Sequence, residues 1–116
     1  MIVGIGVDAC SVERWRRACA RRPGFAERWL TPAEADLAPE SQAARFAAKE
    51  ALAKALRIEQ GLGWHDAWIE TDEYGRPSFG VTGSVAARMT ELGVERLHVS
   101  LTHDGDMAMA FVVAER

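Results

Sequence analysis

The middle of the chain reads Ser41-Gln42-Ala43-Ala44-Arg45-Phe46-Ala47-Ala48-Lys49-Glu50-Ala51-Leu52-Ala53-Lys54-Ala55-Leu56-Arg57. Alanine, leucine, lysine and glutamate dominate this run, and all four have high helix propensity. It predicts one long helix, which is the strongest helix signal in the sequence. Many of its residues are small enough to let another element pack closely against it: Ala44, Ala47, Ala48, Ala51 and Ala55.

Strands are expected on both sides of this helix. Residues 2–8 read as a strand with two glycines, Gly4 and Gly6, which indicate close approach of another backbone or a ligand, or a bulge. Residues 107–113 are almost continuously apolar, which predicts a strand buried on both faces. The other strands are expected at residues 67–72, 78–81 and 96–102.

Shorter helices and turns fill the remaining intervals. Ser11 is expected to cap a helix over residues 12–20. Thr31-Pro32-Ala33-Glu34 has the pattern of a capping box and predicts a short helix that Pro39 ends. Further short helices are expected at residues 25–30 and 82–92, and a turn at residues 61–63.

The composition is that of a folded domain. Hydrophobic residues make up 48% of the 116 residues and charged residues 27%. This length suits one domain with one core. The elements predict a single α+β domain over residues 1–116, in which a small, largely antiparallel sheet packs against the long helix and the shorter helices.

The charge is unevenly distributed along the chain. The formal net charge of −3 argues against a general nucleic-acid-binding protein, which is usually basic. Residues 13–28 nevertheless contain six arginines and two glutamates, a local charge of +4. The rest of the chain therefore carries −7, and the average conceals a basic patch on an acidic body.

The sequence contains no signal for a membrane or an export route. No run approaches the ~18 apolar residues of a membrane-spanning helix, so no membrane partner is expected. The first eight residues have no basic n-region and are too short for a signal peptide. Cys10 and Cys19 form neither a disulfide framework nor a metal-binding spacing, which favours a reducing, cytoplasmic setting.

Four residues of the first strand and the long helix are candidates for chemistry. Glu50 and Lys54 share one face of the helix and could be an ordinary surface pair. Lysine occurs only twice here, against twelve arginines, so Lys54 indicates that a compact ammonium is needed beside the glutamate. Asp8 ends the glycine-containing strand and could be either a structural charge or a ligand of a hard metal ion. Arg45, about 140° from Glu50 around the helix, could flank the same ligand.

The fourth expected strand offers a second set of candidates. His98, Ser100 and Thr102 share one strand face, which could simply be exposed to solvent. His103 and Asp104 follow them and could serve as base and metal ligand, although Asp104 and Asp106 also fit a hairpin turn. The nucleophile elbow, the zinc-protease motif and the phosphate-binding loop are all missing from the sequence.

Four motifs together resemble the holo-[acyl-carrier-protein] synthases, which are small bacterial 4′-phosphopantetheinyl transferases. They are Gly4–Asp8, Arg45–Ala55, Gly75-Arg76-Pro77 and His98–His103. Each motif alone is modest, but their order and spacing match from residue 1 to the end of the chain. The resemblance implies the 4′-phosphopantetheinyl transferase fold and a Mg²⁺-dependent transfer of 4′-phosphopantetheine from coenzyme A to a serine of an apo acyl carrier protein.

The resemblance also assigns roles in the reaction. Asp8 and Glu50 match the carboxylates that bind Mg²⁺, and Asp104 could be a third ligand. Lys54 matches the lysine that approaches the pyrophosphate, and His103 is the candidate for orienting or deprotonating the serine. The residues expected to contact coenzyme A are Arg45, Lys54, Gly75, Arg76, Pro77, His98, Ser100 and Thr102.

The basic patch gains a partner through the same resemblance. In this family the first helix binds the acidic carrier protein, which assigns that role to Arg14, Arg17, Arg21, Phe25 and Arg28. A plain solvated helix face is the alternative. Family members of this size form homotrimers whose active sites lie between subunits.

Two other functions compete with the transferase. One is a non-catalytic module of the same fold that binds coenzyme A or a carrier protein. The other is a nucleic-acid-binding protein, which the small number of aromatic residues around the arginines disfavours.

Overall fold

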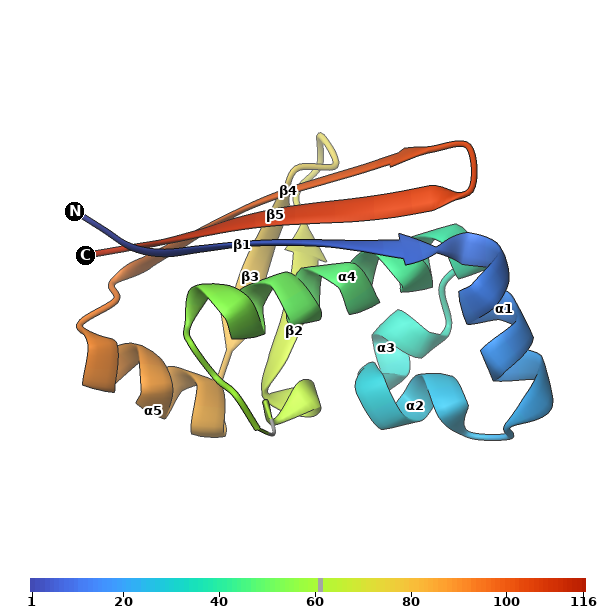
Figure 1. Ribbon diagram of the computed structural model, residues 1–116, viewed down its shortest axis with the longest axis horizontal. Coiled ribbons are helices and arrows are strands. Elements are labelled where there is room, and N and C mark those ends of the chain that lie inside the picture. The colour runs from blue at the N-terminus through green and yellow to red at the C-terminus, as the bar shows by residue number, and fades with distance from the viewer. Residues whose placement is uncertain (61) are drawn as a thin grey trace.

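The computed structural model describes residues 1–60 and 62–116; Gly61, part of the turn expected at residues 61–63, lies outside the described residues. Figure 1 shows a sheet with the helices gathered on one side of it. The elements in chain order are β1 (Ile2–Ser11), α1 (Val12–Arg21), α2 (Phe25–Trp29), α3 (Pro32–Ala35), α4 (Pro39–Ala55), the 3-10 helix η1 (Trp64–Asp66), β2 (Ala67–Thr71), β3 (Pro77–Val81), α5 (Gly83–Leu92), β4 (Arg96–Asp104) and β5 (Met107–Glu115).

The strands form two antiparallel sheets. The larger has the order β1-β5-β4, and the smaller is the β2–β3 hairpin. The long helix α4 lies beneath the larger sheet and runs along β1 and β5 (Figure 1). The α+β class and the long central helix predicted from the sequence are confirmed.

Two glycines of β1 allow α4 to approach the sheet closely. A β-carbon on Gly4 would collide with the carbonyl oxygen of Ala55, and one on Gly6 with that of Ala51. The pairing register between β1 and β5 also shifts between Ile2 and Gly4, so a bulge is present too. Small residues on both elements therefore bring the backbones of β1 and α4 into contact.

The predicted helix caps are confirmed, with one correction. The Ser11 side chain accepts a hydrogen bond from the Arg14 amide, and Thr31 and Glu34 form the expected capping box. Pro39 does not end a helix: α3 has already ended at Ala35, and Pro39 is the first residue of α4. Proline suits this position because its missing N–H would have no helical partner there and its φ angle is already helical.

The expected burial of the last strand on both faces is wrong. In β5 the inward residues are buried: Ala108, Ala110, Val112 and Ala114. The outward residues Met107, Met109 and Phe111 are 40–45% exposed. The helices lie on one side of the sheet, and burial alternates along β5 between residues that face them and residues that do not (Figure 1).

A buried ion pair connects α4 to the smaller elements. Lys49 Nζ lies 2.7 Å from Glu34 Oε1, and the two side chains are 0% and 4% exposed. The same ammonium donates to the carbonyl oxygens of Trp29 (2.9 Å) and Trp64 (2.8 Å), so three acceptors surround it. Glu34 Oε2 in turn accepts from the Ile69 amide. Lys49 thus fixes α2, α3 and η1 against α4.

The helices were also compared with the length and apolarity that a membrane-spanning helix needs. Within residues 1–60 and 62–116, none is both long and apolar enough to cross a membrane.

Candidate functional site

Asp8, Glu50 and Lys54 lie together where β1 packs along α4. Lys54 Nζ donates to the Val7 carbonyl oxygen (2.8 Å) and to Asp8 Oδ1 (3.2 Å). Glu50 lies one helical turn before Lys54 on α4. Asp8 is on the same inward face of β1 as Gly4 and Gly6, so the close approach of α4 brings the three groups together.

The surroundings of Glu50 disfavour its ionised form. Partial burial raises the pKa of Glu50 above its ordinary value, and the charge of Asp8 raises it further. The Lys54 ammonium acts in the opposite direction but is the weaker influence. Two carboxylates thus share one ammonium, which leaves a net negative site.

This donor set fits a hard divalent cation. Two carboxylates, with water and phosphate oxygens in the remaining positions, are typical ligands of Mg²⁺. Among the described residues no group of three or more His, Cys, Asp or Glu side chains gathers in a way that could hold a metal. Asp104, at the end of the opposite edge strand β4, therefore does not join Asp8 and Glu50 within one chain.

Arg45 and His103 meet at a different place. They line a cavity of about 130 Å³ between the first turns of α4 and the end of β4, together with Thr102, Ser41 and Glu40. Burial lowers the pKa of Arg45. Its Nη1 donates to the Ser41 carbonyl oxygen (3.4 Å), whereas its buried Nε has no hydrogen-bond partner within residues 1–60 and 62–116. An unpaired buried donor at a cavity is a favourable place for an anionic ligand.

The remaining predicted coenzyme A contacts lie on other surfaces, except that Thr102 borders both this cavity and the outer face. His98 Nε2 is 2.9 Å from Glu115 Oε1, which also accepts from Arg96. These contacts lower the pKa of Glu115 to about 2. Ser100 and Thr102 border a small hollow of about 110 Å³ on the outer face of the sheet.

The motif Gly75-Arg76-Pro77 lies at the β2–β3 turn. The Asp72 carboxylate accepts from the amides of Tyr74 and Arg76, which shapes the turn. The Arg76 guanidinium is 5.7 Å from the centre of the Tyr74 ring. Tyr74 is 76% exposed, so this turn presents a cation and an aromatic ring to solvent.

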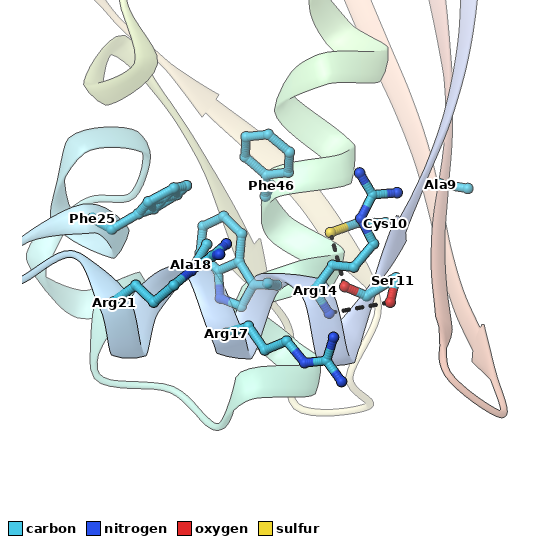
Figure 2. Close-up of a pocket in the computed structure, with 10 residues that line it drawn as sticks. Ala9, Cys10, Ser11, Arg14, Arg17, Ala18, Arg21, Phe25 and Phe46 are labelled. Atoms are coloured by element: carbon cyan, nitrogen blue, oxygen red, sulfur yellow. Dashed lines mark hydrogen bonds between the residues drawn. The ribbon is translucent and has the colours of Figure 1, made fainter.

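Figure 2 shows a larger pocket beside α1, where most of the predicted carrier-binding residues gather. It has a volume of about 430 Å³ and is lined by Arg14, Arg17, Arg21 and Phe25. Arg28 is not among its lining residues and instead lies over the Trp29 ring, 5.4 Å from its centre. Arginines at an apolar pocket suit a partner that is both acidic and partly hydrophobic.

Phe46 is one of several residues that line this pocket but were not predicted from the sequence. Its ring lies 5.1 Å from that of Trp15, which also stands 5.4 Å from Phe25, and all three line the pocket. The available signal was that Phe46 is the one aromatic residue in an alanine-rich helix. Cys10 also lines the pocket, and burial followed by the charge of Asp8 raises the pKa of its thiol to about 11.

Comparisons with known proteins agree on one family. A model of the 4′-phosphopantetheinyl transferase superfamily matches residues 4–112. Holo-[acyl-carrier-protein] synthase of Kocuria rhizophila is 51% identical over 115 residues, which are 99% of this chain and 94% of that protein. The Salinispora arenicola protein of the same name is 53% identical, with both chains fully covered.

Solved structures show the same likeness in three dimensions. Holo-[acyl-carrier-protein] synthase of Neisseria meningitidis has a TM-score of 0.88 and 35% identity, with both chains fully covered. The Helicobacter pylori enzyme in complex with coenzyme A has a TM-score of 0.84 and 31% identity, over 96% of this chain and 99% of that one. The fold, the matched residues and these relatives agree: the chain belongs to the 4′-phosphopantetheinyl transferase superfamily.

Proposed function

We propose that this protein is a holo-[acyl-carrier-protein] synthase, which transfers 4′-phosphopantetheine from coenzyme A to a serine of an apo acyl carrier protein. Relatives about half identical over the whole chain carry that name, and a solved relative is described in complex with coenzyme A. The structural observation that carries the proposal is that Asp8, Glu50 and Lys54 lie together where β1 packs along α4.

The reaction is a displacement at phosphorus. The serine oxygen of the carrier bonds to the β-phosphorus of coenzyme A, and the bond from that phosphorus to the bridging oxygen breaks. Adenosine 3′,5′-bisphosphate leaves with the bridging oxygen and the electron pair of the broken bond, and the serine hydroxyl releases its proton. Such transfers depend mainly on positioning and on neutralising negative charge.

The residues of the chain can supply both. Lys54 is 55% exposed at its side chain and can turn from Asp8 toward a pyrophosphate. The unpaired Nε of Arg45 offers a donor to a phosphate, and His103, in the same cavity, is the candidate to orient or deprotonate the serine. Asp8 and Glu50 would hold Mg²⁺. When bound, Mg²⁺ supplies positive charge that neutralises the pyrophosphate.

The carrier would bind at the pocket beside α1. Its arginines attract an acidic surface over a distance, and the rings of Phe25 and Phe46 offer apolar contact to a side chain that enters the pocket. Attraction of this kind weakens as salt concentration rises.

A homotrimer would complete the site. Asp8 lies on the edge strand β1, whereas His103 lies on the opposite edge strand β4. Within one chain these groups are separated by β5, so a β1 edge and a β4 edge can meet closely only between copies. The exposed outer face, with Val7, Met109 and Phe111, is the apolar surface that a second copy would cover. We place this assembly in the cytoplasm, where the free thiols of Cys10 and Cys19 stay reduced.

A transfer assay distinguishes this function from a non-catalytic binding module. The protein is incubated with Mg²⁺, coenzyme A and a panel of apo carrier proteins, and each carrier is weighed by mass spectrometry. At least one carrier should gain the mass of one phosphopantetheine arm. Tight binding of coenzyme A with no mass gain on any carrier would favour the module instead.

A further inference from the structure

Another aspartate, apart from Asp8 and Glu50, contacts the start of the arginine-rich helix α1. We propose that Asp106, in the β4–β5 turn, is a positioning residue that fixes α1 for carrier binding. This inference rests on the proposed function, because it assigns a part of carrier recognition to a residue that does not line the carrier pocket.

Asp106 contacts three consecutive residues at the junction of β1 and α1. Its Oδ2 accepts from Ser11 Oγ at 2.5 Å, and its Oδ1 accepts from the Glu13 amide at 2.9 Å. Its backbone carbonyl oxygen accepts from the Val12 amide at 2.8 Å. Both carboxylate oxygens and the carbonyl oxygen therefore bind a segment more than ninety residues away in the sequence.

These contacts satisfy the first amides of α1. Helix N-terminal amides have no partner within the helix and need acceptors from elsewhere. Asp106 serves those of Val12 and Glu13, and the Ser11 hydroxyl serves that of Arg14. Because the Ser11 hydroxyl itself donates to Asp106, the local cap also depends on the distant carboxylate. A negative charge is favourable at this end of a helix.

The same contacts connect the two parts of the proposed site. Arg14 and Arg17 follow directly on α1, and Arg17 Nε donates to the Glu13 side chain at 3.2 Å. His103 stands three residues before Asp106, on the strand that enters the turn. The β4–β5 hairpin and the start of α1 lie at the same end of the molecule (Figure 1). Asp106 thus sets the position of the carrier-binding arginines relative to His103.

Turn formation alone does not explain this residue. Gly105, with φ +56°, provides the left-handed backbone of the turn. Hydrogen bonds from Ser11 and Glu13 lower the pKa of Asp106, so it stays ionised at neutral pH.

Asp66 provides a matched control. It accepts from the Ser84 amide (2.9 Å) and the Ser84 hydroxyl (2.7 Å) at the start of α5. Helices α5 and α1 both have ten residues, and in each case one aspartate binds a serine hydroxyl and a backbone amide at the start of the helix. The difference is that α5 carries none of the residues assigned to substrates or carrier.

The test measures steady-state transfer by the full-length protein for wild type, Asp106→Ala, Asp106→Asn and Asp66→Ala, with carrier and coenzyme A varied separately. Loss of a helix cap commonly corresponds to a factor of about five in an equilibrium, so Asp106→Ala should raise the KM for the carrier by roughly that factor. Its KM for coenzyme A should stay within twofold of wild type, as a rough bound. Asp106→Asn, which keeps one acceptor oxygen, should fall between. Asp66→Ala should lower the melting temperature similarly and change neither KM.

Two results would overturn the inference while leaving the proposed function intact. One is equal KM values for the carrier in Asp106→Ala and Asp66→Ala; the other is a rise of both KM values together in Asp106→Ala. Failure of the wild-type protein to modify any carrier would instead contradict the proposed function itself, and the inference with it.

Discussion

Single residues in this protein hold charge in places where charge is costly. Glu50 is the example nearest to the chemistry, because burial and the neighbouring Asp8 both raise its pKa. A raised pKa in the folded state means that the ionised form is disfavoured there, relative to the unfolded chain. Glu50 therefore lowers stability at neutral pH, and this penalty disappears as the pH falls through its raised pKa. A stability cost of this kind is expected where two carboxylates are placed together to bind a cation.

Glu50→Gln should therefore separate stability from activity. Without Mg²⁺ the variant should melt at a higher temperature than wild type at neutral pH, because the disfavoured carboxylate is gone. Its transfer rate should fall by about 100-fold or more, since one of the two carboxylates proposed for the metal is missing. Calorimetry and the transfer assay measure the two effects. Mg²⁺ should raise the melting temperature of wild type and not that of Glu50→Gln, and an equal rise in both would argue against Glu50 as a ligand.

Lys49 has a different task from Lys54, although both lysines lie on α4. Lys49 is fully buried between Glu34 and the carbonyl oxygens of Trp29 and Trp64. Lys49→Met should lower the free energy of unfolding by about 3–5 kcal/mol, because Glu34 is left buried without its counter-charge. Urea denaturation of Lys49→Met, Glu34→Gln and the double variant measures the coupling of the pair. The double variant should cost less than the sum of the single variants, by about 1–3 kcal/mol; strict additivity would mean that the pair does not act as a unit.

At the scale of the elements, the sequence predicted most of the fold for identifiable reasons. Gly4, Gly6 and the alanines of α4 indicated a close approach, and the structure places the Gly6 and Ala51 backbones in contact. Pro39 was misassigned because proline disfavours the interior of a helix and favours its first position, and sequence alone does not separate these two effects. The burial of β5 was misjudged because Met109 and Phe111 read as core residues.

The candidate site was harder to predict than the fold. Asp8, Glu50 and Lys54 lie together because alternation along β1 and the helical period of α4 put them on facing sides, although Asp8 lies within β1 and not at its end as the sequence suggested. Asp106 was read only as a turn residue, since its partners Ser11 and Glu13 are remote in sequence. Contacts of that range depend on the β1–β5 pairing, which sets Ser11 opposite Met107 and which no local pattern encodes.

Some arginines of helix α1 line the carrier pocket and others face solvent away from it, and this difference gives a test of the pocket. Arg14 lines the pocket, whereas Arg16, two residues later and also exposed, does not. Arg14→Glu and Arg16→Glu change the net charge equally. We expect Arg14→Glu to raise the KM for the carrier by about tenfold, in line with the loss of a charge-assisted contact, and Arg16→Glu to have a much smaller effect. Measurement at two salt concentrations separates local contact from general attraction, and equal effects of both variants would contradict the pocket as the binding surface.

At the scale of the whole molecule, the outer face of the sheet is an apolar surface that the single chain leaves exposed to solvent. Met107, Met109 and Phe111 expose apolar area there, together with Ile5 and Val7 of β1. Light scattering should give a mass of three copies for the wild type. Phe111→Arg should shift the mass toward one copy, because a charge on this face opposes its burial against a second copy. Tyr74→Arg, which changes an exposed aromatic residue elsewhere, serves as the control and should leave the mass unchanged. A single-copy mass for the wild type would contradict the assembly.

The stoichiometry of the two products tests the proposed transfer reaction. The protein, Mg²⁺, coenzyme A and an apo carrier that it modifies are sampled over time, and carrier mass and released adenosine 3′,5′-bisphosphate are measured in each sample. The proposed function predicts one nucleotide released for every carrier that gains a phosphopantetheine arm, with neither product formed when the carrier serine is replaced by alanine. Nucleotide release without carrier modification, or no consumption of coenzyme A with any carrier tested, would contradict it.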